Sequence, residues 1–438
     1  MEITVQIVAK QTVKPSSPTP DHLRNFKLCL LDQLSPAAHG SVILFYLTIG
    51  NRSTYDYKFQ QLKGSLADTL TRFYPLAGRI REDSSIECND HGVVFAQAKV
   101  NCFLSDCLES PDAKLLSKLI PGEFDNGSVL AVQSTCFDCG GLAIGVCISY
   151  KIGDGSTLST FIQSWAAAAL VGSAEAAVPL LNAASIFPPQ NLPLPTPPPA
   201  ESRTDMSVTR RFVFDGSKIA ALKAKSTSET VTNPTRVEAV TALIWKCAMN
   251  ASRSNSDHIS LSILSQSGDI RKKMVPPLPG HTIGHLVGYF ASLATESEME
   301  LKSLVAQLRK GEQDFGENYV EKLQGDQETF LAISKSIQEA GLLLQRGATD
   351  FYISISLCRF PFYGVDFGWG RPSWVTVPSG AYTNVFAMIE TRNGDGIEAW
   401  VTLTEDDMAF FERDQDLLAV ASSNPSACNC PIMPQSSL

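Results

Sequence analysis

Seven prolines lie between Phe187 and Ala200, in the run FPPQNLPLPTPPPA. Because proline fixes φ and lacks a backbone donor, this segment can form neither a helix nor a central strand. It predicts an extended, stiff connection between two folding units. The chain has 438 residues, enough for two domains that each bury a full core. We therefore expect an N-terminal domain at 1–186, a linker at 187–208 and a C-terminal domain at 209–438.

Strand and helix patterns alternate along the first half of the chain. Apolar runs at Val42–Leu47 and Leu142–Ile148 predict buried strands. The spacing of apolar residues in Gln60–Tyr74 and Ser156–Ala169 predicts amphipathic helices. Glu87–Val100 predicts a β-hairpin with an Asn-Asp-His-Gly turn. This alternation favours an α/β fold.

The second half continues the alternation. Thr235–Met249 predicts a helix, with Thr235 as its cap and Glu238 three residues later completing a capping box. Ala381–Ile389 and Ile397–Leu403 predict a hairpin around an Asn-Gly-Asp-Gly turn.

Charge and composition exclude several classes of partner. The formal net charge is −9 without a basic run, which disfavours binding to nucleic acid or to an acidic membrane surface. No apolar stretch is long enough to cross a bilayer, and the charged, alternating N-terminus does not resemble a signal peptide. The eleven cysteines are irregularly spaced, which favours free thiols in a reducing compartment. A lone C-x-x-C pair, Cys136 and Cys139, has no second pair at zinc-site spacing, so no metal is expected. We expect a cytoplasmic protein, although Ser436-Ser437-Leu438 weakly resembles a peroxisomal signal.

A strand, a tight turn and a helix meet at Ser149–Gly155, which reads SYKIGDG. Side chains at such a junction commonly face a ligand, so Tyr150 and Asp154 are candidate catalytic residues. Asp154 also fits the N-cap of the following helix. On this motif alone, a purely structural turn is the better interpretation.

A second motif, DFGWG at 366–370, lies near the C-terminus. Together the two motifs resemble the paired HxxxDG and DFGWG signatures of the plant BAHD acyltransferases. DFGWG is complete, whereas Tyr150 stands where that family has a histidine as general base. The stretches LDQL at 31–34 and YPLAGR at 74–79 also resemble the family.

The resemblance implies an α/β fold of two similar chloramphenicol-acetyltransferase-like domains with a central solvent channel. It implies acyl transfer from acyl-CoA, with acetyl-CoA as the first candidate, to a small-molecule acceptor of plant alkaloid or terpenoid metabolism. It also implies a monomer, and places the helix that begins at Thr235 near CoA.

The resemblance further assigns roles to individual residues. Asp154 orients its loop by pairing with Arg271, which stands in a D-x-R motif. Asp366, Gly368 and Trp369 are structural and shape the second domain and the CoA channel, away from the reacting atoms.

Acyl transfer to an alcohol needs a base for the acceptor's proton and a donor for the oxyanion. A tyrosine with a pKa near 10 is about one part in a thousand phenolate at pH 7, a handicap of roughly 4 kcal/mol against histidine. Tyr150 can instead donate a hydrogen bond, as an oxyanion donor, a general acid or a packing residue. Among the six histidines, His285 is the candidate for a relocated base, because it follows Gly284 where the family usually has Gly-Asn. The simpler prediction for His285 is a partly exposed loop histidine.

Three functions stay open. The first is an acyl-CoA-dependent O- or N-acyltransferase that works without the usual histidine. The second is CoA-independent lyase, elimination or cyclisation chemistry on the same scaffold, with Tyr150 as a donor. The third is a non-catalytic binder. We favour the first, because the preserved motifs outnumber the one missing residue.

Overall fold

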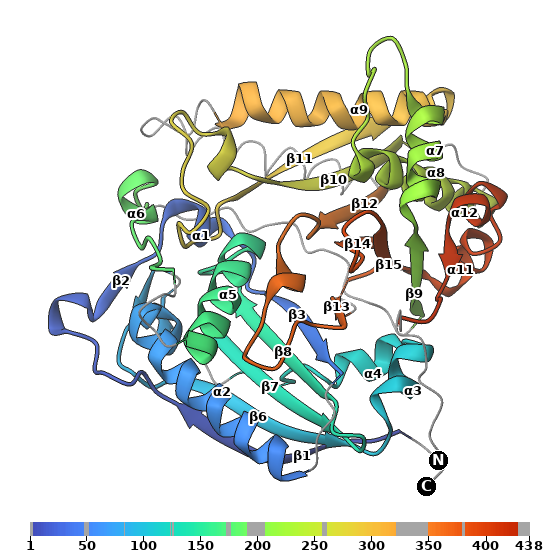
Figure 1. Cartoon of the computed structure of the whole chain (residues 1–438). Helices are drawn as coiled ribbons and strands as arrows, with labels where there is room; N and C mark the ends of the chain where they lie inside the picture. Colours follow the sequence, from blue (N-terminus) through green and yellow to red (C-terminus); the bar gives the residue numbers. More distant parts are fainter. Residues whose placement is uncertain are drawn as a thin grey trace, which may run out of the picture.

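Two mixed sheets hold most of the strands, one above the other in Figure 1. The computed structural model describes residues 3–47, 52–82, 84–122, 124, 127–171, 177–190, 206–255, 261–320, 349–378 and 382–427. The six-stranded sheet has the order β1 (Val5–Val13), β6 (Val93–Val100), β7 (Leu130–Phe137), β8 (Leu142–Ser149), β3 (His39–Tyr46) and β13 (Trp374–Thr376). The seven-stranded sheet has the order β11 (Val287–Ala294), β10 (Leu261–Asp269), β12 (Thr349–Ser356), β14 (Val385–Glu390), β15 (Ile397–Thr404), β9 (Ser207–Phe214) and β16 (Ser422–Ser423). A small sheet joins β2 (Asn25–Lys27), β5 (Ser85–Glu87) and β4 (Arg79–Arg81).

Each large sheet has its own helices. On one face of the six-stranded sheet lie α2 (Arg52–Arg72) and α5 (Gly155–Val171), and on the other face lie α3 (Leu104–Glu109) and α4 (Ala113–Ser117). The seven-stranded sheet packs against α7 (Gly216–Ser226), α8 (Arg236–Asn255), α9 (Leu301–Asp314), α11 (Glu405–Phe411) and α12 (Gln415–Val420). A smaller core includes α1 (Leu30–Leu34) and α6 (Ala183–Ile186). Single 3-10 turns occur at Asp21–Leu23, Tyr74–Ala77, Arg271–Lys273, Glu296–Glu298 and Phe362–Gly364, and a π-helical turn at Phe315–Val320 extends α9. Within the described ranges, no helix has both the length and the apolar character that a membrane span requires.

α5 carries the predicted apolar stripe. Leu158, Phe161, Ile162 and Trp165 are all buried, and the indole N–H of Trp165 donates to Ser65 Oγ of α2 at 3.0 Å. Truncation of a buried aromatic side chain of this kind costs about 3–5 kcal/mol. This packing fixes α5 against the six-stranded sheet, and with it the turn that precedes the helix.

β13 ties the two sheets together. It comes from the C-terminal half of the chain but pairs antiparallel with β3 of the six-stranded sheet. Trp374 stacks on Phe45, with ring centroids 5.0 Å apart, and its indole N–H donates to Glu398 of β15 at 3.1 Å. Glu398 also forms a buried ion pair with Arg211 of β9. The sheets are therefore joined by a buried polar network.

The predicted hairpin at Glu87–Val100 is wrong. β5 pairs with β2 and β4, whereas β6 pairs with β1 and β7. Asp90, at the intended turn, accepts hydrogen bonds from the backbone N–H and hydroxyl of Thr19 and from Arg24. The segment thus anchors the N-terminal loop and leads from the small sheet into the six-stranded one.

Most of the predicted linker, residues 191–205, lies outside the described residues. At its start, Phe187 is buried and the backbone N–H of Gln190 donates to Gln33 Oε1 at 2.9 Å. At its end, β9 begins at Ser207. The domain boundaries themselves stay a prediction.

Candidate active site

Asp154 and Arg271 form a buried, two-pronged ion pair. Arg271 Nη1 lies 2.7 Å from Asp154 Oδ2, and Nη2 lies 3.2 Å from Oδ1. Asp154 caps α5 as predicted, accepting the Thr157 N–H at 2.9 Å. Burial alone would raise the pKa of Asp154, but the attraction and hydrogen bonds of Arg271 outweigh it and lower that pKa. Asp154 is therefore ionised at neutral pH and stabilises the structure through Arg271, and no proton-transfer role follows from its position.

The pair holds a loop that we call the His285 loop, residues 282–286. Arg271 donates to the carbonyls of Thr282 (2.9 Å) and Gly284 (3.0 Å), and Asp154 accepts the N–H of Leu286 at 3.0 Å. Thr157 Oγ1 lies 3.0 Å from the Gly284 carbonyl oxygen. The motif aspartate thus positions the segment that carries His285.

His285 is buried, with 4% of its surface exposed, so the prediction of a partly exposed loop histidine is wrong. The hydrogen bonds from Arg271 and to Asp154 hold its loop in the interior, which is the physical reason for this burial. Its Nδ1 lies 3.4 Å from the Gly153 carbonyl oxygen, and its Nε2 lies 3.2 Å from the Tyr289 hydroxyl. Burial lowers the pKa of His285, which favours the neutral ring. A carbonyl oxygen can only accept, so Nδ1 carries the proton and Nε2 presents its lone pair to Tyr289.

Tyr150 lies beside His285, with ring centroids 5.2 Å apart. Its backbone is fixed, because its N–H donates to Ala38 O at 2.9 Å and its carbonyl accepts from Ser35 Oγ at 2.7 Å. The ring lies against Gly40 of β3, where a Cβ would come within 2.8 Å of Cε1. Burial, with a contribution from Tyr382, raises the pKa of Tyr150. The phenol therefore stays protonated and can donate a hydrogen bond, but it cannot serve as a base.

Asp32 is a site residue that the sequence reasoning did not single out. It is buried and accepts the backbone N–H groups of His285 at 2.7 Å and Cys29 at 2.9 Å. Burial raises the pKa of Asp32 to about 6. A charged residue directly after the apolar run at 28–31 was the signal that could have revealed it. Near it, the ammonium of Lys151 donates to the Gln33 carbonyl at 3.1 Å.

The DFGWG loop is closed by hydrogen bonds to its own aspartate. Asp366 Oδ1 accepts the N–H groups of Gly368 (2.8 Å) and Gly370 (2.9 Å), both in the left-handed region with φ of 103° and 101°. Phe367 lies edge-to-face on Trp165 and stacks on Trp369, within the core of the six-stranded sheet. The expectation that this loop shapes the second domain is therefore corrected: its aromatic side chains pack against α5 and its sheet, as the loop's position over α5 in Figure 1 also shows.

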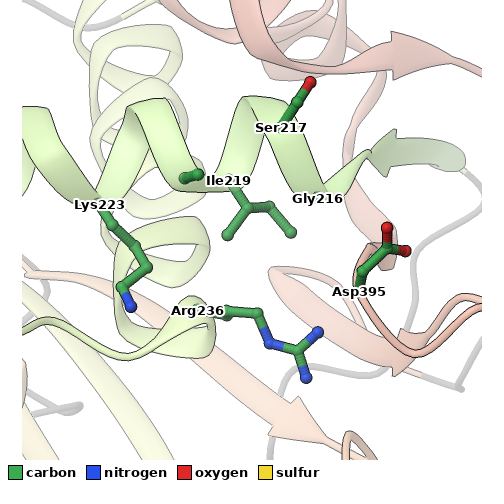
Figure 2. Close-up of a pocket in the computed structure, with 7 residues that line it drawn as sticks. Gly216, Ser217, Ile219, Lys223, Arg236 and Asp395 are labelled. Atoms are coloured by element: carbon green, nitrogen blue, oxygen red, sulfur yellow. The ribbon is translucent and has the colours of Figure 1, made fainter.

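Thr235 forms the predicted capping box at the start of α8. Its Oγ1 accepts the N–H of Glu238 at 3.1 Å, and Glu238 accepts the N–H of Thr235 at 2.6 Å. The next residue, Arg236, lines a hollow of about 470 Å³ between α7, α8 and the β14–β15 turn, seen in Figure 2. Its lining residues are Gly216, Ser217, Ile219, Ala220, Lys223, Arg236 and Asp395.

Across the described ranges, no cluster of three or more His, Cys, Asp or Glu side chains is arranged to hold a metal ion.

Sequence comparisons place this chain in a known family. Residues 3–418 match the model of the transferase family. Epi-neemfruitin B 7-O-acetyltransferase of Melia azedarach is 36% identical, covering 96% of this chain and 99% of its own length. BAHD acyltransferase BIA1 of Arabidopsis thaliana is 38% identical (97% and 99%), and stemmadenine O-acetyltransferase of Catharanthus roseus is 35% identical (94% and 96%). The chain therefore belongs to the transferase family that includes the plant BAHD acyltransferases.

Solved structures agree on the fold. Vinorine synthase matches with a TM-score of 0.81 at 31% identity, covering 97% of this chain and 100% of that one. F. graminearum TRI101, solved with coenzyme A and T-2 mycotoxin, matches with a TM-score of 0.68 at 16% identity (91% and 99%), a likeness of fold alone. The expected α/β fold of two domains is confirmed.

Proposed function

We propose that the protein is an acyl-CoA-dependent O- or N-acyltransferase of plant alkaloid or terpenoid metabolism. Two relatives, stemmadenine O-acetyltransferase and epi-neemfruitin B 7-O-acetyltransferase, support these acceptor classes. The observation that carries the proposal is the buried, neutral His285 beside Tyr150, on a loop held by Asp154 and Arg271. This cluster supplies the base that the missing motif histidine would otherwise provide.

In the proposed reaction, His285 takes up the proton of the acceptor O–H or N–H as that atom attacks the thioester carbonyl. Tyr150, still protonated, donates a hydrogen bond to the carbonyl oxygen while negative charge develops there. Collapse of the tetrahedral intermediate breaks the C–S bond, and the CoA thiolate receives the proton from His285. The acyl group has then moved to the acceptor, CoA leaves as a thiol, and both side chains are restored.

We propose that CoA binds toward the Thr235 end of α8. Lys223, Arg236 and Asp395 line the adjacent hollow. Arg236 is paired with Glu390 at 2.6 Å, so the ammonium of Lys223 is the charge that suits a phosphate of CoA. The resemblance to BAHD enzymes supports acetyl-CoA as the first donor to test. We further propose that the enzyme is a cytoplasmic monomer, which light scattering and a fluorescent fusion would test.

The direct test is an assay of purified protein with acetyl-CoA, using stemmadenine and epi-neemfruitin B as probe acceptors. We expect acceptor-dependent release of the CoA thiol and an acetylated product by mass spectrometry. The proposal fails if a wider panel of alkaloid and terpenoid alcohols and amines gives no thiol above the acceptor-free rate, and calorimetry detects no CoA binding.

A second candidate function is CoA-independent elimination or cyclisation, favoured by the protonated phenol of Tyr150. Conversion of a probe without CoA that is lost in Tyr150→Phe would support it. If Tyr150→Phe is silent and Tyr150→His gains acyl transfer, this candidate is wrong. Tight CoA binding with no turnover of either kind would instead identify a non-catalytic binder.

A further inference from the structure

Tyr289 lies between the buried His285 and solvent. It belongs to β11, one of the two edge strands of the seven-stranded sheet, and is 49% exposed, whereas His285 is 4% exposed. The next residue, Phe290, stacks on Phe315 at the end of α9, with ring centroids 5.2 Å apart. Because successive side chains of a strand point to opposite faces, Tyr289 points away from α9.

The donor and the acceptor in the hydrogen bond between Tyr289 and His285 follow from the second contact of the histidine ring. Nδ1 of His285 faces the Gly153 carbonyl and carries the proton, so the Tyr289 O–H donates to the lone pair on Nε2. A phenol oxygen can accept a hydrogen bond from a second hydroxyl while its own O–H donates. The arrangement therefore joins the hydroxyl of a half-exposed tyrosine to a buried base in one proton-transfer step.

Resting on the acyltransferase function proposed above, we propose that Tyr289 is a catalytic proton relay between the acceptor and His285. The acceptor O–H bond breaks as its oxygen attacks the acyl carbon, and its proton passes to the Tyr289 oxygen. At the same time the original Tyr289 proton passes to Nε2, which leaves Tyr289 neutral and His285 protonated. When the C–S bond breaks, the imidazolium returns its proton to Tyr289, and Tyr289 transfers a proton to the CoA sulfur.

This route explains how a chain without the motif histidine can use a base that is almost fully buried. At no step does the enzyme need a free phenolate, which is the difficulty with Tyr150 as a base. His285 needs no direct contact with the acceptor, since the half-exposed Tyr289 makes that contact.

The test compares wild type, Tyr289→Phe and the control Tyr57→Phe, a 70% exposed tyrosine on α2. The probes are acetyl-CoA and whichever of stemmadenine and epi-neemfruitin B is turned over. We expect Tyr289→Phe to lower kcat about 10²-fold with the KM for acetyl-CoA unchanged, and Tyr57→Phe to match wild type. If Tyr289 had only a structural role, its replacement would not change the number of protons that move in the rate-limiting transition state. We therefore also expect kcat in H₂O–D₂O mixtures to give a curved, two-proton profile for wild type and a linear one for Tyr289→Phe.

The relay is overturned if Tyr289→Phe keeps kcat within about twofold of wild type, or if it loses activity but keeps the curved profile. His285→Gln separates failure of the relay from failure of the proposed function. If wild type acylates the probe and His285→Gln is equally active, His285 is not the base and Tyr289 is not a relay. The acyltransferase function would still hold. If wild type itself acylates no acceptor, the proposed function fails first.

Discussion

Asp32 is a carboxylate held in the interior by two backbone N–H groups, those of Cys29 and His285. Burial raises its pKa from 3.8 to about 6. Between these two values the folded protein binds a proton that the unfolded chain releases, so this residue's contribution to stability is present below about pH 4 and is lost as the pH rises through 6. The shift corresponds to a loss on the order of 3 kcal/mol.

Asp32→Asn should remove this pH dependence. We expect the variant to become more stable relative to wild type as the pH rises from 4 to 7, measured by urea unfolding at each pH. Asp21→Asn, at an exposed carboxylate, is the control and should follow wild type throughout. Parallel profiles for Asp32→Asn and wild type would contradict the buried-carboxylate interpretation.

Gly40 allows the Tyr150 ring to lie close against β3. In Gly40→Ala, the new Cβ would lie 2.8 Å from Tyr150 Cε1, so the ring must move. We expect kcat for acyl transfer to fall at least about tenfold, with a loss of stability of about 1–3 kcal/mol from the overpacked contact. Gly64→Ala in α2 meets no atom within 4 Å and should preserve kcat and stabilise the helix by up to about 1 kcal/mol. An unchanged kcat in Gly40→Ala would show that the position of the Tyr150 ring is unimportant.

At the scale of elements, two segments hold the His285 loop in place. One is the strand–turn–helix that carries Asp154, and the other is the 3-10 turn that carries Arg271. In Arg271→Lys, the single ammonium cannot satisfy Asp154 and the carbonyls of Thr282 and Gly284 together. We expect a loss of about 3 kcal/mol in urea unfolding and a fall in kcat of about 10²-fold, because a loop shifted by about 1 Å misplaces the base.

Arg309→Lys is the matched control for this change. Arg309 also pairs with a carboxylate, Glu238, but its own side chain is 30% exposed. We expect it to lose about 1 kcal/mol or less and to keep kcat. If Arg271→Lys is destabilised as expected but retains kcat, the clamp does not position His285.

The helices could be predicted because their caps are local sequence signals. The site could not be predicted, because it depends on contacts between residues far apart in the sequence. The caps at Asp154 and Thr235 are encoded within four residues of each helix start, so α5 and α8 follow from the sequence. The hairpin at Glu87–Val100 failed because strand pairing depends on partners elsewhere in the chain, here β1 and β7. The burial of His285 depends on Asp32, 253 residues away, which no local pattern encodes.

At the scale of the whole molecule, the two sheets supply different halves of the candidate site. Tyr150 follows β8 of the six-stranded sheet, and His285 precedes β11 of the seven-stranded sheet. The distance between the two rings therefore depends on how the sheets are joined. The network of Trp374, Glu398 and Arg211 is a buried part of that junction, so a change there should affect activity without touching the site.

Glu398→Gln tests this connection. The amide keeps the shape of the carboxylate but leaves the buried Arg211 without its counter-charge, which costs about 3–5 kcal/mol in comparable pairs. We expect urea unfolding to report a loss of that size, and kcat for acyl transfer to fall while the protein is still folded. Glu412→Gln breaks the neighbouring surface pair with Arg210, whose side chains are 39% and 49% exposed, and should cost less than about 1 kcal/mol with kcat unchanged. Equal losses of stability in the two variants would contradict a special role for the buried junction. A stability loss confined to Glu398→Gln with kcat intact would show that the two halves of the site are held together elsewhere.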